Sequence, residues 1–164
     1  MNKDEKKSFY IDNNQKIELL KYNISRFDHY YASVNFKSSF LVLGNITILG
    51  FLMKNEVHSI FFNILLILIT FSLIFVLLAI KPYLKPYQGS SSILFFNDIA
   101  SNESIFTNKL KKLSQEEYIL DLKEQTITLA KGLKVKFSYL NKATIIFMIN
   151  IIIFFLIILT SGVK

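Results

Sequence analysis

The sequence contains no cysteine, and this absence removes three kinds of site at once. A disulfide scaffold, a thiol nucleophile and a cysteine-ligated zinc all require that residue. Histidine is nearly absent too, since His29 and His58 are the only two and stand far apart in the chain. The chain also lacks the glycine-rich phosphate cradle of P-loops and dinucleotide-binding folds, so the sequence gives no support to an ATP-driven machine.

Four carboxylates lie close together in the second half of the chain, at Glu116, Glu117, Asp121 and Glu124. No histidine, serine nucleophile or metal-ligand spacing accompanies them, so we interpret them as the solvated face of a helix. His29 is more easily explained as an interfacial residue than as a base. The sequence therefore predicts a protein that is not an enzyme and that holds no metal.

What the chain has in abundance is apolar sequence, since 52% of its 164 residues are hydrophobic. Long apolar runs cover residues 36–53, 60–80 and 143–160. At about 1.5 Å per helical residue the second run extends roughly 32 Å and the third roughly 27 Å, which suffices, given interfacial anchors, to cross a hydrocarbon core of about 30 Å. These lengths predict three transmembrane helices.

The first run is the most polar of the three, because Lys37, Asn45 and Thr47 lie within it. The alternative is a buried hairpin of two helices in a soluble protein. The second run argues against that alternative, because residues 61–80 contain no charged side chain. We therefore predict an all-α membrane protein.

The net charge of +7 is unevenly distributed along the chain. Residues 1–39 hold seven Lys or Arg and residues 81–142 hold ten, whereas the remaining two fall in the loop 54–59 and in the tail 161–164. Cytoplasmic segments of membrane proteins carry such an excess of Lys and Arg. The distribution predicts that segments 1–35 and 81–142 are cytoplasmic and that the loop and the tail are external. The positive charge is then a topology signal rather than a sign of nucleic-acid binding.

A stripe of apolar residues precedes the first run, and its members are spaced alternately by three and four. The stripe consists of Ile17, Leu20, Ile24, Phe27, Tyr31 and Val34. This spacing predicts an amphipathic helix that runs straight into the first span. Asp12, Asn13 and Asn14 are the candidate N-caps.

A second stripe precedes the last run and has the same spacing. It consists of Ile119, Leu122, Thr126, Leu129, Leu133, Lys136 and Leu140. Ser114 and Glu117 form a capping box before it, and the helix can continue through Gly132 into the last span. Two stripes of like period would pack on each other, so the N-terminal and C-terminal helices are predicted to extend into a small cytoplasmic helical domain.

Between the second run and the second stripe, residues 81–113 are irregular. The two prolines in 81–86 end the second span, and 88–92 forms a turn by composition. Residues 93–100, Ile-Leu-Phe-Phe-Asn-Asp-Ile-Ala, are either a strand or helical turn packed over the bundle, or the wall of a pocket.

Several short motifs in a fixed order resemble a known family. They are Arg-Phe-Asp-His-Tyr-Tyr-Ala-Ser-Val-Asn-Phe-Lys (26–37), two spans, Lys-Pro (81–82), Ile-Leu-Phe-Phe-Asn-Asp-Ile-Ala (93–100), Glu-Glu-Tyr (116–118), Val-Lys-Phe (135–137) and a last span. This order resembles the transmembrane effectors of the Pycsar antiphage systems, which are small bacterial inner-membrane proteins encoded beside a pyrimidine cyclase.

The resemblance implies a mechanism with three steps. A cyclase triggered by infection makes cyclic CMP or cyclic UMP, the nucleotide binds the cytoplasmic part, and the spans assemble or rearrange until membrane integrity fails. The cell then dies before phage mature, which is abortive infection. The implied setting is the inner membrane with the N-terminus in the cytoplasm. The implied partners are the nucleotide, the cyclase, the bilayer and further copies of the chain, without any cofactor.

The alternative is a passive membrane scaffold or a holin-like lysis protein without nucleotide sensing. A holin needs no ligand and usually lacks a sizeable folded region between its spans. Residues 81–142 are such a region, and the resemblance makes them the sensor.

Candidate ligand residues follow from what a cyclic nucleotide offers, which is one phosphate charge, a ribose hydroxyl and a base. Phe96 can stack on the base and Asp98 can pair with its edge or with the hydroxyl. Lys136 lies between Leu133 and Leu140 on the inward stripe, where a lone ammonium is costly without an anion, and snorkelling to the headgroups is its alternative. The full candidate set is Arg26, Lys37, Phe96, Asp98, Tyr118 and Lys136.

Two amides within the spans are candidates for assembly. Asn45 and Asn150 each lie seven residues inside a span, roughly 10 Å along its axis, so they share a depth. An amide in hydrocarbon seeks a partner, and the two would bond within one protomer or between protomers. The alternative is that each bonds its own helix backbone or a neighbouring threonine. Three spans are too few to enclose a sizeable aqueous path, so we predict a homo-oligomer.

Overall fold

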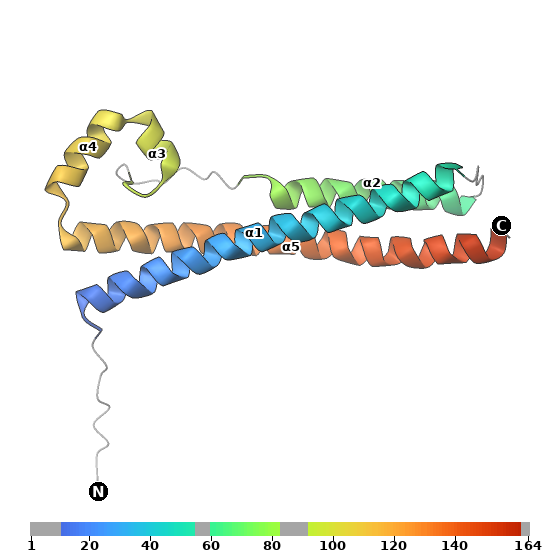
Figure 1. Cartoon of the computed structure of the whole chain (residues 1–164), viewed down its shortest axis with the longest axis horizontal. Coiled ribbons are helices and arrows are strands. Elements are labelled where there is room, and N and C mark those ends of the chain that lie inside the picture. The colour runs from blue at the N-terminus through green and yellow to red at the C-terminus, as the bar shows by residue number, and fades with distance from the viewer. Residues whose placement is uncertain (1–10, 55–59, 83–91, 162–164) are drawn as a thin grey trace, which may run out of the picture. The chain divides into compact units, whose positions relative to one another are not determined.

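The computed structural model describes residues 11–54, 60–82 and 92–161. Within these ranges the chain is all-α, as predicted, and contains no strand. Its helices are α1 (Asn13–Lys54), α2 (Ile60–Ile80), α3 (Phe96–Ser101), α4 (Glu103–Lys112) and α5 (Gln115–Ser161) (Figure 1). The predicted external loop, most of the predicted turn over 88–92 and the predicted external tail fall outside the described residues.

Helices α1 and α5 are much longer than a membrane is thick. They contain 42 and 47 residues. At about 1.5 Å per residue each extends about 60–70 Å, roughly twice the hydrocarbon core. The prediction that both amphipathic stripes continue without a break into a span is therefore confirmed. With α2, which begins and ends where the sequence predicts the second span, three helices are long and apolar enough to cross a membrane.

Both long helices begin with reciprocal caps. At α1 the Gln15 amide donates to Asp12 Oδ1 (2.8 Å), and the Asp12 amide donates to Gln15 Oε1 (3.1 Å). At α5 the Glu117 amide donates to Ser114 Oγ (3.2 Å), and the Ser114 amide donates to Glu117 Oε2 (3.0 Å). The bond from the Ser114 amide, and then that from its hydroxyl, lowers the pKa of Glu117, which lies far along the helix from the predicted span 143–160. These bonds satisfy amides that have no partner inside the helix.

The chain divides into two compact units. Unit 1 comprises residues 1–27 and 85–129, and unit 2 comprises residues 28–84 and 130–164. The beginnings of α1 and α5 belong to unit 1 together with α3 and α4, whereas their remaining lengths belong to unit 2 with α2.

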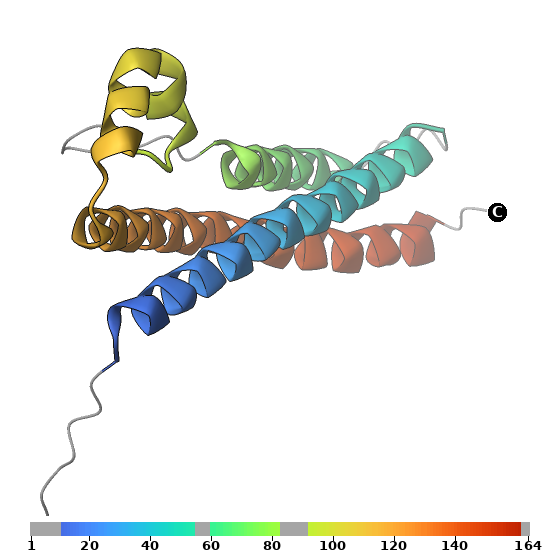
Figure 2. The same cartoon turned by 60° about the vertical axis from the view of Figure 1, so that its left-hand side comes forward.

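Unit 2 is a bundle of three helices, in which α1 crosses α5 obliquely (Figures 1 and 2). The buried positions on each helix are spaced by three, four or seven residues, which is the period of helices that pack as in a coiled coil. On α1 they are Val34, Ser38, Leu41, Asn45, Ile48 and Leu52; on α2 they are Leu65, Ile69, Ser72, Val76 and Ala79; on α5 they are Leu133, Lys136, Leu140, Ala143, Asn150 and Ile157.

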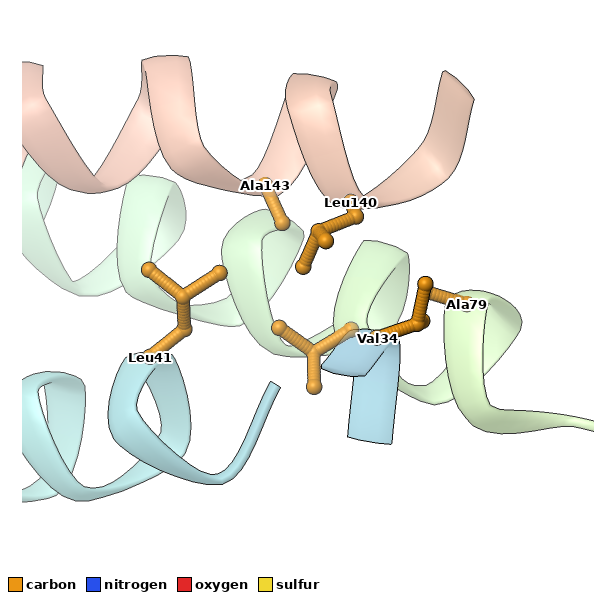
Figure 3. Close-up of a cluster of buried hydrophobic side chains, with 6 residues drawn as sticks. Val34, Leu41, Ala79, Leu140 and Ala143 are labelled. Atoms are coloured by element: carbon orange, nitrogen blue, oxygen red, sulfur yellow. The ribbon is translucent and has the colours of Figure 1, made fainter. Parts of the chain in front are cut away.

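The bundle core contains two apolar clusters at different levels. In one, Val34 and Leu41 of α1 approach Leu140 and Ala143 of α5 and Ala79 of α2 (Figure 3). The other cluster is formed by Ile48, Leu52, Leu65, Ile69 and Ile157. The first cluster lies near the end of α2 and the second near its beginning, so the two differ in depth along the bundle.

The Phe147 ring of α5 packs against α1 at Gly44. A Cβ atom at this position would lie 2.4 Å from Cζ of Phe147, far inside van der Waals contact. The glycine is required here because its missing side chain leaves room for the aromatic ring. At Gly50, by contrast, an added Cβ would meet nothing within 4 Å.

The outer faces of the three bundle helices expose large apolar side chains. Examples are Phe40 on α1, Ile67 and Phe71 on α2, and Ile152 and Leu156 on α5. A soluble protein rarely exposes so many apolar side chains on adjoining helices. This surface agrees with a bundle surrounded by lipid.

Candidate functional site

A tight turn precedes α3 and is held by two side chains. Ser92 Oγ accepts hydrogen bonds from the amides of Leu94 and Phe95, both at 3.0 Å. Asp98 Oδ2 accepts the Ser92 amide at 2.8 Å. Asp98, a predicted ligand residue, therefore uses one carboxylate oxygen to fix this turn.

Asp121 of α5 holds the same turn from the other side. Its Oδ2 accepts the amide of buried Ile93 at 2.8 Å, and only 8% of the residue is exposed. The interpretation of Asp121 as part of a solvated face was wrong. The reason is that the Ile93 amide, buried away from water, needs an acceptor, and Asp121 supplies it. Glu116 and Glu117 are exposed as expected, and Glu124 is half-buried.

The segment 93–100 adopts the helical alternative, since a turn leads into the short helix α3. Phe96, at the first position of α3, exposes 63% of its surface. Its ring lies 5.3 Å from that of Phe95, with the planes tilted by 54°. An exposed ring of this kind is free to stack on a flat ligand.

Two cations lie over aromatic rings in unit 1. Nζ of Lys21 is 5.8 Å from the centre of the Tyr118 ring, and Cζ of Arg26 is 5.6 Å from that of Tyr22. Both separations fall within the range of cation–π attraction. Arg26 and Tyr118 were predicted ligand residues, whereas Lys21 was missed. The only sequence signal for it was its place beside Leu20 on the first apolar stripe.

Lys136 is buried in unit 2, with 5% of its surface exposed. Its ammonium donates to the carbonyl oxygens of Ala79 (2.7 Å) and Lys81 (2.8 Å), and lies 5.5 Å from the Tyr31 ring centre. The last carbonyls of a helix have no partner within it and carry partial negative charge. Lys136 thus caps the C-terminus of α2. Sequence reasoning identified the inward lysine but not these backbone partners.

The six predicted ligand residues are divided between the two units. Arg26, Phe96, Asp98 and Tyr118 lie in unit 1, and Lys37 and Lys136 lie in unit 2. Lys37 is exposed on α1. The structure thus places four of the six in one compact unit.

The two predicted amides meet inside the unit 2 bundle. Asn150 Nδ2 donates to Asn45 Oδ1 at 3.0 Å, and both residues are fully buried. Asn45 Nδ2 donates to Ser72 Oγ (3.0 Å) and also to the Leu41 carbonyl (2.8 Å).

The network closes on α5, because Ser72 Oγ donates to the Ala143 carbonyl at 3.3 Å. These hydrogen bonds connect α5 to α1, α1 to α2, and α2 back to α5. Of the arrangements considered from the sequence, the structure has the bond within one protomer, and Asn45 also bonds its own helix. Ser72 was missed although it accepts from Asn45 and donates to the Ala143 carbonyl, because a lone serine in an apolar run gives no sign of partners on two other helices.

Two apolar hollows lie on the outside of unit 2. One of about 260 Å³ is formed by α1 and α2 at Ser38 and Val76, and one of about 430 Å³ by α1 and α5 at Gly44 and Phe154. Neither is lined by a charged residue, so neither offers a partner for a phosphate. Across the described ranges, no three His, Cys, Asp or Glu side chains are grouped as a metal site would require.

The fold and these contacts define a class: an all-α membrane protein with three helices long and apolar enough to cross a membrane, two of which are about twice as long as the hydrocarbon core is thick. The sequence model of PycTM, the Pycsar effector protein domain, matches residues 19–162. The chain therefore belongs to the Pycsar transmembrane effector family, and the resemblance seen in its motifs is confirmed. No curated protein and no solved structure matches it.

Family membership defines the coarse role of the protein. It is an antiphage effector of the membrane that works with a cyclase system. Membership in an effector family also favours a non-enzymatic role.

Proposed function

We propose that a cyclic pyrimidine mononucleotide, cyclic CMP or cyclic UMP, activates this effector and that the active form impairs the inner membrane, causing abortive infection. The observation that carries the proposal is the match of the Pycsar effector domain over residues 19–162, which includes all three span-capable helices. A passive scaffold or a holin-like protein would have no use for a cyclase partner.

Unit 1 is where we place the nucleotide. A cyclic nucleotide needs a cation for its phosphate and an aromatic ring for its base. Lys21 and Tyr118 supply such a pair on α1 and α5, and exposed Phe96 supplies a second ring. Asp98 Oδ1, to which none of the described residues donates a hydrogen bond, is available for the base edge or the ribose hydroxyl.

Lys136, in unit 2, is a separate candidate for binding a phosphate. An ammonium has three donors, and two of them are used on α2 carbonyls. A third donor is left for an anion. Measuring nucleotide binding by variants of Lys136 separates a role in phosphate binding from its role in capping α2.

Titration calorimetry of the detergent-solubilised full chain tests the ligand. We expect heat with cyclic CMP or cyclic UMP and none with cyclic AMP. Lys21→Met should weaken binding at least tenfold, whereas Lys16→Met, five residues earlier on α1 and with its ammonium bonded to Asn13, should not. Absence of heat with both pyrimidine nucleotides would contradict the proposal.

Orientation is tested separately. We propose that the N-terminus and residues 81–142 are cytoplasmic, because they hold seventeen of the nineteen Lys and Arg residues. Reporter fusions after Ser59 and Lys164 should report an external position, and a fusion after Lys112 a cytoplasmic one. A cytoplasmic signal at Ser59 would exclude the three-span topology.

Self-association is also proposed, but through a different surface from the two amides considered in the sequence. Asn45 and Asn150 are fully buried within one chain, so they do not reach a second copy in this state. Contacts between copies would come from the exposed apolar faces of α1, α2 and α5. Light scattering of the purified protein with and without cyclic CMP or cyclic UMP measures the mass, and an unchanged monomer would contradict assembly.

A further inference from the structure

A lysine lies beside a pair of stacked aromatic rings where α2 and α5 meet. Nζ of Lys142 is 5.6 Å from the ring centre of Phe75 on α2 and 5.7 Å from that of Tyr139 on α5. The two rings have centres 6.3 Å apart and planes tilted by 25°. Both aromatic residues are half-buried, whereas Lys142 is exposed on the outside of the bundle. Cation–π attraction therefore places an ammonium at a defined point of the outer surface.

The level of this ammonium follows from its neighbour on α2. With 21 residues of about 1.5 Å each, α2 just crosses a hydrocarbon core of about 30 Å. Phe75 lies five residues before the last residue of α2, Ile80, and thus about 7 Å inside that end. Side chains of a helix lean toward its N-terminus, so the Phe75 ring leans further from the end. The Lys142 ammonium consequently lies at the edge of the hydrocarbon rather than in bulk water.

The chain has no carboxylate near this level. No Asp or Glu follows Glu124 in the sequence, none occurs in α2, and none lies between Asp28 and the end of α1. Aromatic faces attract a cation but do not neutralise it. Charged side chains at such a depth pair with an opposite charge or extend to the headgroups. The phosphate of a lipid headgroup is the anion that the bilayer itself brings to this level.

The surface around Lys142 changes from basic to apolar along the bundle. Toward the beginning of α5, the exposed Lys131 and Lys134 lie on the same side of the helix as Lys142. In the other direction the exposed side chains of Ile145 on α5 and Phe71 on α2 follow, each one helical turn further on. A phospholipid has the same order, with a charged headgroup followed by apolar chains.

We propose that this seam between α2 and α5 binds an anionic phospholipid, with Lys142 on the headgroup phosphate and an acyl chain along Phe71 and Ile145. Clusters of lysine at a membrane surface attract such lipids, and here the aromatic pair fixes where the charge lies. The proposal goes beyond nucleotide sensing and does not rest on nucleotide activation. It gives the effector a preference among the lipids of the membrane that surrounds it.

The chain contains no tryptophan, so a single fluorescent reporter can be introduced at the seam. Phe71→Trp replaces one exposed aromatic side chain by another. The full chain is reconstituted in mixtures of phosphatidylcholine and phosphatidylglycerol, in which the acyl chains of one lipid or the other carry bromine, a quencher of tryptophan fluorescence. The two quenching curves measure which lipid lies beside the reporter. We expect phosphatidylglycerol to be favoured about fivefold, which is the contribution of one lysine near an anionic surface.

Two lysine variants in the reporter background separate a site from a general effect of charge. Lys142→Met should abolish the preference for phosphatidylglycerol. Lys37→Met is the matched control, because it removes an equally exposed lysine from α1 and lowers the net charge by the same amount. It should leave the preference unchanged. Absence of any preference in the reporter protein, or the same preference in both lysine variants, would overturn the proposal.

A second reporter covers the case in which Phe71→Trp fails to fold, which circular dichroism would show. Ile145→Trp repeats the measurement from α5, and the same outcomes are expected.

Nucleotide calorimetry distinguishes a lipid phosphate from a nucleotide phosphate. Lys142→Met should bind cyclic CMP or cyclic UMP as the wild type does. A loss of nucleotide binding in Lys142→Met would assign its ammonium to the nucleotide and overturn the proposal. Failure of the wild type to bind either nucleotide would contradict the proposed function and leave the lipid result standing.

Discussion

The hydrogen bond between Asn45 and Asn150 offers a quantitative test of the bundle core. Asn45 makes two side-chain bonds to other helices, one with Asn150 and one with Ser72, both at 3.0 Å. In membranes such bonds contribute about 0.6 kcal/mol on average and up to about 1.7 kcal/mol. Leucine is branched at the same carbon as asparagine, so Asn45→Leu removes both bonds with little change of shape.

The expected cost of Asn45→Leu is therefore about 1–3 kcal/mol of unfolding free energy. Asn150 would then lose its partner, since its Oδ1 already has none. Replacing Asn150 by Leu in that background removes an amide that is no longer paired, so the second substitution should cost less than it does alone. We expect the double variant to be more stable than the sum of the single effects by about 0.5–2 kcal/mol.

Reversible unfolding by SDS in mixed micelles, followed by circular dichroism, measures these energies. Asn63→Leu is the control, because Asn63 is exposed on α2 and should show no coupling to Asn150. Additivity of Asn45→Leu and Asn150→Leu to within about 0.3 kcal/mol would refute the bond as a coupled pair. The double variant should also reduce ligand-triggered killing, because it removes the hydrogen bond that links α1 to α5 in the bundle.

Three further predictions concern packing, the turn and a cap. Gly44→Ala should destabilise the protein by about 1–3 kcal/mol through overpacking, whereas Gly50→Ala should leave stability equal or higher; thermal unfolding in detergent measures both. Asp121→Ala should speed hydrogen exchange of the Ile93 amide, followed by mass spectrometry of peptides. The cap at Glu117 should weaken in acid: its pKa is below the ordinary 4.5 in the folded chain, so its stabilisation is present above 4.5 and disappears as the pH falls through the lowered pKa.

Each of these predictions has an outcome that opposes it. Equal melting temperatures for the two glycine variants would mean that the Phe147 ring accommodates a methyl group at residue 44 without loss of stability. Unchanged exchange at Ile93 would show that the turn does not depend on Asp121. For the cap, circular dichroism between pH 6 and pH 3 should show a loss of helicity that Glu117→Gln no longer shows, and identical profiles would oppose the argument.

The three long helices were predictable because their signals are local and periodic. The helix α4 (Glu103–Lys112) was missed, since it lies in the segment 81–113 that was interpreted as irregular. The alternate spacing of three and four from Ile17 to Val34, continued through the apolar run, defines α1 as one helix. The capping box at Ser114 marks the beginning of α5. Even the pairing of Asn45 with Asn150 followed from counting residues into two parallel spans.

The contacts that the sequence did not predict involve backbone atoms. The partners of Lys136 are carbonyl oxygens of Ala79 and Lys81, and the partner of Asp121 is the amide of Ile93. Every residue has these groups, so no pattern of side chains reveals which of them a charged residue will meet. From the sequence, Lys136 was consequently interpreted as an ammonium that needs an anion, and Asp121 as a solvated carboxylate.

Membrane potential in living cells tests the central claim most directly. The full chain is expressed with an active pyrimidine cyclase or with a catalytically inactive version, and a potential-sensitive dye is followed by flow cytometry. The account predicts that the potential collapses only when the effector and the active cyclase are present together. An unchanged potential with the active cyclase, or a collapse that is equal with the inactive one, would contradict activation by a cyclic pyrimidine nucleotide.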